Sequence, residues 1–188
     1  MKKVIKKPST TLFPIPAVMV SCKGPSGKAN IVTIAWTGVM NSDPPLLYIG
    51  LRPEGRHSYG IIKESMEYVI NIPGARQAKL VDYCGMVSGK DVDKFEAAGL
   101  TPVPASQVQA PLIAECPVNI ECRVTQVLPL GSHDVFIGEV LAVHYNEDVL
   151  DEKGRPDLDK IQPYGFCANE YRLMGDKVGF FGYSKKKD

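Results

Sequence analysis

One continuous apolar run, Leu46–Leu51, constrains the fold of this 188-residue chain more than any other segment. The run follows the rigid pair Pro44-Pro45 and leads into a basic loop at 52–58. A short apolar run bounded by breakers is typical of a strand that is buried on both faces. We therefore expect a sheet with this segment in its interior.

Other short segments also have strand character. Val118–Val124 alternates apolar and polar side chains, the pattern of a half-buried strand. The regular alternation of strands and helices that a doubly wound sheet requires is missing. Six or seven strands with few helices favour a mainly β fold, a closed antiparallel barrel, because closure removes exposed strand edges. The expected strands are Ala17–Cys22, Asn30–Thr37, Leu46–Leu51, Tyr68–Ile72, Val118–Val124 and Val135–Tyr145.

Three short helices are expected in the middle of the chain, at Ser58–Ser65, Ala75–Cys84 and Asp91–Ala98. Gly99 follows the third, at a position where a residue with positive φ commonly ends a helix. We expect 146–162 to be a long charged loop, and the aromatic, glycine-containing tail at 163–183 has only weak periodicity.

Length and charge limit the class of protein. A chain of 188 residues with 44% apolar content is expected to form a single domain. Its net charge of +1 gives no electrostatic sign of a nucleic-acid or membrane partner. No apolar run approaches the ~18 residues that span a bilayer, and the N-terminus lacks the apolar core of a signal peptide, so we expect a cytoplasmic protein. The basic ends are expected to be solvated tails; their lysines are Lys2, Lys3, Lys6, Lys7, Lys185, Lys186 and Lys187.

Several kinds of site are not indicated. The five cysteines have no C-x-x-C spacing, so we expect small buried thiols rather than disulfides. The three histidines have no ligand spacing with any cysteine, which argues against zinc. We expect His133 and His144 to be structural. The motifs of a Rossmann domain, a hydrolase triad and a zinc protease are missing, and Ser88-Gly89-Lys90 lacks the upstream glycine of a triphosphate-binding loop.

Two neighbouring segments have ligand-binding character. In Asn30–Thr37 the small side chains Thr33, Ala35 and Thr37 share one face of the expected strand, which provides a flat surface for a planar ring. The loop at 52–58 places arginines before the expected start of a helix, and both features bind phosphate. Each segment also has a plainer interpretation, because threonine is common in strands and basic loops are often only solvated. Together they suit a ligand with a flat ring and an anionic tail, such as FMN.

The chain resembles the flavin reductase-like family of FMN-binding split-barrel proteins, and within it the flavoredoxin-type members. The resemblance lies in ANIVTIAWTGVMNSDPPLLYIGLRPEGRHSYGIIKES, in YVINIP and in CGMVSGKDVDKFEAAGLTP, with AECPVNIECRV and IGEVLAVH similar to the second half of the barrel. It covers about residues 11–175. The resemblance implies a six-stranded Greek-key split barrel that forms a homodimer, with FMN near the subunit interface.

The resemblance also implies roles for individual residues. It places one group at the isoalloxazine ring, namely Asn30, Thr33, Ile34, Ala35, Trp36 and Thr37. It places a second group at the phosphate and ribityl chain, namely Arg52, Arg56, His57 and Ser58. A third group would close the site, namely Cys84, Ser88, Gly89 and Lys90. Phe95 would pack beneath the site, and Phe166 or Tyr164 would cover the ring.

The implied activity is that of an oxidoreductase. FMN would accept reducing equivalents from NAD(P)H or a redox protein and pass them to free flavin or another acceptor. The alternative is a flavoredoxin-type electron carrier without NAD(P)H turnover, which the lack of a nicotinamide-binding motif favours. A third interpretation is an FMN-binding barrel without redox turnover. Because the flavin carries the chemistry, we expect no catalytic residue.

Overall fold

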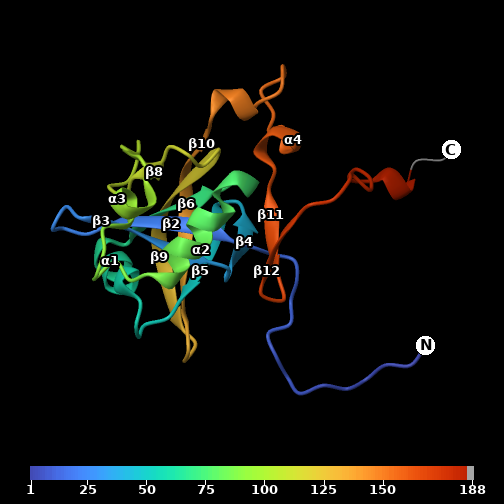
Figure 1. The fold of residues 1–188 in the computed structure, drawn as a ribbon, viewed down its shortest axis with the longest axis horizontal. Helices are drawn as coiled ribbons and strands as arrows, with labels where there is room; N and C mark the ends of the chain where they lie inside the picture. The colour runs from blue at the N-terminus through green and yellow to red at the C-terminus, as the bar shows by residue number, and fades with distance from the viewer. Residues whose placement is uncertain (186–188) are drawn as a thin grey trace.

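A seven-stranded sheet forms the body of this computed structural model, which describes residues 1–185 (Figure 1). The strand order is β3–β2–β6–β9–β10–β5–β4, so β3 and β4, which are consecutive in the chain, lie at opposite ends of the order. Lys186 and Lys187 of the expected basic tail lie outside the described residues. The strands of this sheet are β2 (Val18–Lys23), β3 (Ala29–Ile34), β4 (Thr37–Ser42), β5 (Pro45–Leu51), β6 (Glu67–Ile72), β9 (Val118–Pro129) and β10 (Asp134–Tyr145).

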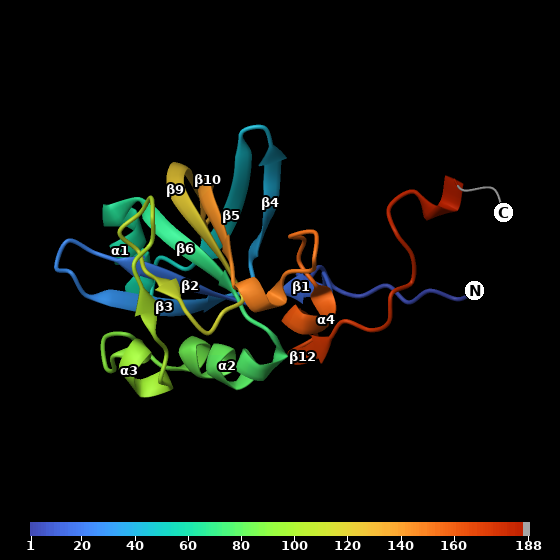
Figure 2. The ribbon, with the colours of Figure 1, turned by 90° about the horizontal axis from the view of Figure 1, so that it is seen from above.

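The crossing from β3 to β4 decides the shape of the sheet. Ala35 and Trp36 are the two residues between these strands, and the three steps from Ile34 to Thr37 span at most about 11 Å. The two edges of the sheet must therefore meet at this corner, which curls the sheet. The backbone N–H of Gly50 donates to the carbonyl oxygen of Trp36 at 2.6 Å and fastens the corner to β5. Figure 2 shows β3 beside α2 and the β4–β5 hairpin at the far side of the curled sheet.

The sheet has seven strands and is not the closed six-stranded barrel that the sequence predicted. The strand expected over Asn30–Thr37 is two strands, because the chain leaves β2 after Ile34 and pairs with β5 from Thr37. Small and bulky side chains alternate through Trp36 without interruption, so the sequence carries no local signal for this change of partner. Within residues 1–185 no ladder pairs β3 with β4, and the mainly β sheet is curled rather than closed.

The apolar run that constrained the fold is buried in its second half. Ile49, Gly50 and Leu51 are buried, whereas Leu46–Tyr48 are partly exposed, because the β4–β5 hairpin extends beyond the body of the sheet (Figure 2). Inside the curl, Ile49 packs in one core cluster with Tyr68 and Phe136, none of which has exposed surface.

Three helices form close to their expected positions. α1 (His57–Ser65) follows β5, and α2 (Ala78–Met86) follows the 3₁₀ turn η1 (Ala75–Gln77) and lies against β3. α3 (Lys94–Ala98) begins later than expected, because the Asp93 carboxylate accepts hydrogen bonds from the first backbone N–H groups of the helix and caps it there. Gly99 ends it with a φ of 63°, as expected.

The C-terminal part of the chain contains more structure than its weak periodicity indicates. The expected long loop includes η2 (Glu147–Val149) and α4 (Leu158–Ile161). β11 and β12 then form a hairpin that pairs with β1, which joins the N-terminal arm to the C-terminal hairpin. No helix of the described residues is long and apolar enough to cross a membrane. The remaining elements are β1 (Ile15–Pro16), β7 (Pro102–Val103), β8 (Leu112–Ile113), β11 (Tyr164–Cys167), β12 (Glu170–Leu173) and η3 (Tyr183–Lys185).

The cysteines are free thiols, as expected, and four of the five are buried, with Cys167 partly exposed. Burial raises the pKa of Cys22 and of Cys122 to about 12, so both are protonated at neutral pH. Both belong to the core cluster inside the curled sheet.

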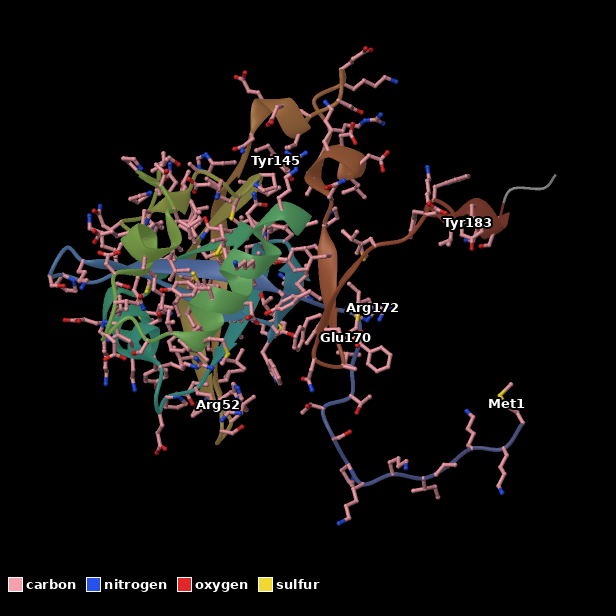
Figure 3. The ribbon with its side chains drawn as sticks, in the orientation of Figure 1. Met1, Arg52, Tyr145, Glu170, Arg172 and Tyr183 are labelled. Carbon is pink, nitrogen blue, oxygen red and sulfur yellow. The ribbon has the colours of Figure 1, made fainter. Side chains whose placement is uncertain are left out.

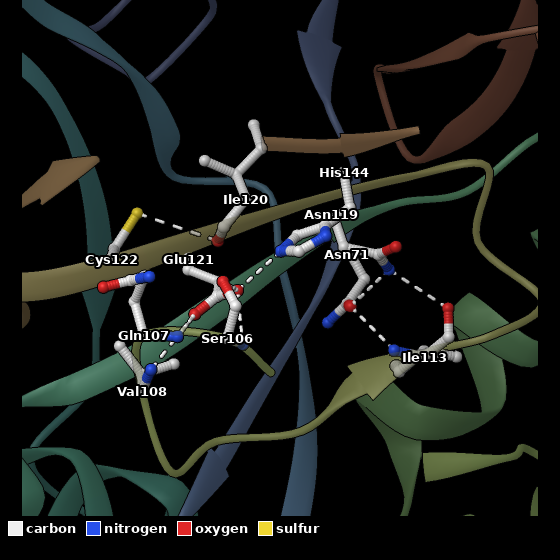
Figure 4. Close-up of polar contacts among 10 residues, drawn as sticks. All are labelled: Asn71, Ser106, Gln107, Val108, Ile113, Asn119, Ile120, Glu121, Cys122 and His144. Carbon is white, nitrogen blue, oxygen red and sulfur yellow. Dashed lines mark hydrogen bonds and ion pairs between the residues drawn. The ribbon is translucent and has the colours of Figure 1, made fainter. Parts of the chain in front are cut away.

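A buried amide joins the segment at 103–113 to the sheet (Figure 4). The Asn71 side chain donates to the carbonyl oxygen of Met19 at 3.0 Å. Its Oδ1 accepts from the Ile113 backbone N–H at 3.0 Å and from the Asn119 amide at 2.8 Å. Because no part of Asn71 is exposed to water, no solvent can replace these bonds.

Glu121 holds the same segment from the next strand (Figure 4). Its buried carboxylate accepts from the backbone N–H groups of Ser106, Gln107 and Val108, and lies 2.5 Å from His144 Nε2. Burial by itself raises the pKa of Glu121, but the hydrogen bonds outweigh it and lower the pKa to about 2. His144 therefore has a structural partner.

We expect Asn71→Ala to lower the free energy of unfolding by about 3 kcal/mol, because it leaves several buried polar groups without partners. Urea denaturation followed by circular dichroism measures the change. Asn41→Ala is the control, because Asn41 is exposed and makes one side-chain bond, to the Pro44 carbonyl oxygen. Equal effects of the two substitutions would contradict the structural role of Asn71.

Candidate functional site

A cavity of about 380 Å³ opens where the β3–β4 corner faces α2 and the β11–β12 hairpin. Apolar and small groups form its wall on the β3 side, and aromatic groups of the hairpin form the opposite wall. We call it the ring cavity. It is lined by Ala17, Val32, Thr33, Ile34, Ala35, Trp36, Gly50, Leu51, Arg52, Arg56, Asp82, Gly85, Met86, His133, Phe166, Asn169 and Tyr171.

Close packing of α2 on β3 forms the floor of the ring cavity. The Thr33 hydroxyl donates to the Val81 carbonyl oxygen, which fastens the strand to the helix. A Cβ at Gly85 would lie 3.2 Å from the Thr33 Cβ, so a glycine lets the helix approach this closely. β3 is an edge strand, so one side of its backbone has no strand partner and is available for hydrogen bonds.

A second, smaller cavity of about 130 Å³ adjoins the ring cavity. The two share Val32, Arg56 and Met86, so they lie next to each other. We call the smaller one the tail cavity. Its lining consists of those three residues together with Asn30, Gly55, His57, Ser58, Val87, Ser88, Gly89 and Lys94.

The tail cavity is shaped by backbone approach. The Asn30 amide donates to the Ser58 hydroxyl at 2.8 Å, which links β3 to the first turn of α1. A Cβ at Gly89 would lie 2.2 Å from Asn30 Oδ1, so a larger residue here would displace the amide. Glycine at this position therefore brings the 86–89 backbone directly against the cavity.

Two cations at the tail cavity have no acidic partner among residues 1–185. Arg56 Nη1 donates to the Gly85 carbonyl oxygen at 3.1 Å, and Lys94 Nζ donates to the Cys84 carbonyl oxygen at 2.7 Å. Lys94 is only 4% exposed, and burial lowers its pKa. A carbonyl oxygen does not neutralise the charge of a cation, and the N-terminus of α1 adds positive potential. The tail cavity is therefore suited to an anion.

A stacked aromatic pair forms the rim on the other side of the ring cavity. The rings of Trp36 and His133 lie 5.5 Å apart between centroids and 9° from parallel. Burial lowers the pKa of His133, and the charges of Arg52 and Arg56 lower it further. His133 is therefore neutral at physiological pH.

The structure brings most of the predicted site residues to the two cavities. Those at the ring cavity are Thr33, Ile34, Ala35, Trp36, Arg52, Arg56 and Phe166. Those at the tail cavity are Asn30, Arg56, His57, Ser58, Ser88 and Gly89.

Five other predicted residues line neither cavity. The Thr37 hydroxyl donates to the Tyr48 carbonyl oxygen, so its side chain links the start of β4 to β5. Cys84 and Phe95 are buried in the core cluster between α2, α3 and β3. Lys90 is exposed to solvent, and Tyr164 packs against the same cluster.

Sequence reasoning missed several lining residues. The sequence contained an indication for Lys94, because a positive charge in the first turn of a helix is unfavourable unless the residue has another role. No feature of the sequence indicated that Asp82 and Tyr171 line the cavity. The Tyr171 hydroxyl donates to the Asp82 carboxylate at 3.2 Å and joins the hairpin to α2. Within the described part of the chain, no cluster of residues is suited to hold a metal ion.

Comparisons with known proteins identify the family. The model of the flavin reductase like domain matches residues 10–174. The chain belongs to this family. A solved structure of flavoredoxin from Desulfovibrio vulgaris (Miyazaki F) is 32% identical, with a TM-score of 0.91 over 99% of this chain and 100% of that one. Flavoredoxin from Methanosarcina acetivorans is 30% identical, with a TM-score of 0.88 over 98% of each chain. An uncharacterized protein of Pyrococcus abyssi is 33% identical over 89% of this chain and 94% of its own length.

The Trp36–His133 pair provides a spectroscopic test of the site's charge. Trp36 is the single tryptophan of this family member, so its fluorescence reports on the pair. Protonated imidazole quenches indole fluorescence more strongly than neutral imidazole. We expect the fluorescence of the ligand-free protein to titrate with a midpoint below the usual His value of about 6.5. The titration is expected to disappear in His133→Gln and to move upward in Arg52→Gln; a wild-type midpoint at or above the usual value would contradict the assignment.

Proposed function

We propose that this flavin reductase-like protein binds FMN and works in flavin-dependent electron transfer. The observation that carries the proposal is that the two cavities are adjacent and share three lining residues. The first has a volume of about 380 Å³, and the second adjoins it and has cations that lack carboxylate partners. An elongated ligand with a flat ring and a terminal anion matches this arrangement, and FMN is such a ligand.

In the proposed complex the chain's residues bind and orient the cofactor. The backbone of 33–36 would hold the polar edge of the ring, where its N–H groups stabilise negative charge. Phe166 from the hairpin would cover the ring. The phosphate would lie in the tail cavity, held by residues with charged, hydroxyl or amide donors, namely Asn30, Arg56, His57, Ser58, Ser88, Gly89 and Lys94. Bound FMN supplies the redox chemistry.

Two electron-transfer roles follow from this proposal. In the first, the protein is an FMN-dependent oxidoreductase that takes electrons from NAD(P)H and passes them to free flavin or another acceptor. In the second, it is a carrier that exchanges electrons with redox proteins. The similarity to two flavoredoxins over nearly the full length of each chain supports the carrier role.

We also propose a homodimer with FMN near the interface. The arms at both termini reach away from the body and carry exposed apolar residues such as Leu12 and Phe181 (Figure 1). Val39 on β4 is likewise exposed, close in sequence to the ring cavity. A second copy would bury these groups. A cytoplasmic location is part of the same proposal, and the free thiols support it.

Substitutions in the tail cavity test the position of the phosphate. We expect Lys94→Met and Ser58→Ala each to weaken FMN binding by about tenfold or more, because a contact to a charged group is lost, and to leave riboflavin binding nearly unchanged. Isothermal titration calorimetry measures both ligands. Lys79→Met is the matched control, because Lys79 is exposed and lines neither cavity. Equal losses for FMN and riboflavin would place the phosphate elsewhere.

The electron donor distinguishes the two roles. The purified protein loaded with FMN is expected to be yellow, and its absorbance is followed under anaerobic conditions. Rapid bleaching by NADH or NADPH identifies a reductase. Bleaching only after a reduced redox protein is added identifies a carrier. Failure to bind FMN at all would overturn both.

A further inference from the structure

Arg52 lies outside the tail cavity, although it shares a loop with Arg56. It lines the ring cavity and a separate cavity of about 750 Å³ between the 52–55 loop and the β9–β10 turn. Figure 3 shows Arg52 at the margin of the body. Arg56, in contrast, lies between the ring cavity and the tail cavity. The two arginines therefore lie on different sides of the ring cavity.

Strand register places Arg52 beside the stacked pair. Leu51, the last residue of β5, is paired with Asp134, the first residue of β10, so Arg52 and His133 are the residues directly beyond this pair. Gly50 is hydrogen-bonded to Trp36. Arg52, Trp36 and His133 all line the ring cavity, and the charge of Arg52 lowers the pKa of His133.

Gly50 makes room for the indole. A Cβ at this position would lie 2.9 Å from the Trp36 Cβ. The missing side chain allows Trp36 to lie across the strand, and Trp36 remains 46% exposed. A flat aromatic surface and a guanidinium group are thus presented together at the outer rim of the ring cavity.

The charges that line the ring cavity favour an anion at this rim. They are Arg52, Arg56 and Asp82. Asp82 accepts a hydrogen bond from Tyr171 on the hairpin, and Arg56 donates to the Gly85 carbonyl oxygen. The guanidinium of Arg52 forms no hydrogen bond or ion pair with any residue in 1–185. It is free to bind a ligand.

We propose that Arg52, Trp36 and His133 form a binding site for a planar aromatic carboxylate, the second substrate at the flavin, and that Arg52 does not hold the FMN phosphate. The inference rests on the proposed function, since it takes the ring cavity as the flavin site. The guanidinium binds a carboxylate through two parallel hydrogen bonds. The aromatic ring of the ligand stacks at the exposed indole.

The test compares benzoate with benzamide, which has the same shape and no charge. Both are titrated into FMN-loaded protein by calorimetry, and the visible absorbance of the flavin is recorded. We expect benzoate to bind about tenfold more tightly than benzamide, as a charge-assisted pair implies. Arg52→Gln is expected to reduce this preference to about twofold or less, and Trp36→Leu to weaken both ligands alike.

Arg56→Gln is the matched control. At saturating FMN it is expected to keep the preference for benzoate, while its preference for FMN over riboflavin falls. Arg52→Gln is expected to show the opposite pattern, with FMN and riboflavin affinities unchanged. A preference for benzoate that survives Arg52→Gln, an absent preference in the wild type, or a selective loss of FMN affinity in Arg52→Gln would each overturn this site alone. Wild-type protein that binds no FMN would instead overturn the proposed function and this inference with it.

Discussion

The crossing at Ala35 and Trp36 is the constraint on which the rest of this structure depends. Two residues carry the chain from one edge of the sheet to the other, and the hydrogen bond from Gly50 to Trp36 holds the corner together. The crossing brings the end of β3, the start of β4 and the end of β5 to one place. The ring cavity opens beside it and the tail cavity adjoins the ring cavity, so the backbone geometry that curls the sheet also shapes the candidate site.

Close backbone approach gives this site its shape, and unpaired charge gives it its preference for anions. Gly85 and Gly89 allow α2 and the turn after it to contact Thr33 and Asn30. Lys94 and Arg56 donate to backbone carbonyls rather than to carboxylates. Carbonyl oxygens orient these side chains and leave their charge in place, and for the buried Lys94 this costs stability in the absence of an anion. Such an arrangement is typical of a binding site rather than of a scaffold.

Local patterns predicted most of the elements and much of the site. Five of the six expected strands and the three expected helices are present with shifted ends, and the remaining expected strand, Asn30–Thr37, is divided between β3 and β4. The ligand-binding character of 29–58 was visible because its residues are neighbours in the sequence. Lys94, Asp82 and Tyr171 were not predicted as a group, since α2, α3 and the β11–β12 hairpin come together only through tertiary packing.

The sequence by itself determined that this chain is mainly β, that a flat strand precedes a basic loop, and that its thiols stay unpaired, because each of these properties depends on local pattern. Tertiary structure decided that the Asn30–Thr37 run is shared between two edges of the sheet. It also decided that Arg56 lines both the ring cavity and the tail cavity while Arg52 lines only the ring cavity of the two. The direction in which a side chain points depends on strand register and on the partner strand, and neither is encoded in the spacing of residues along a single segment.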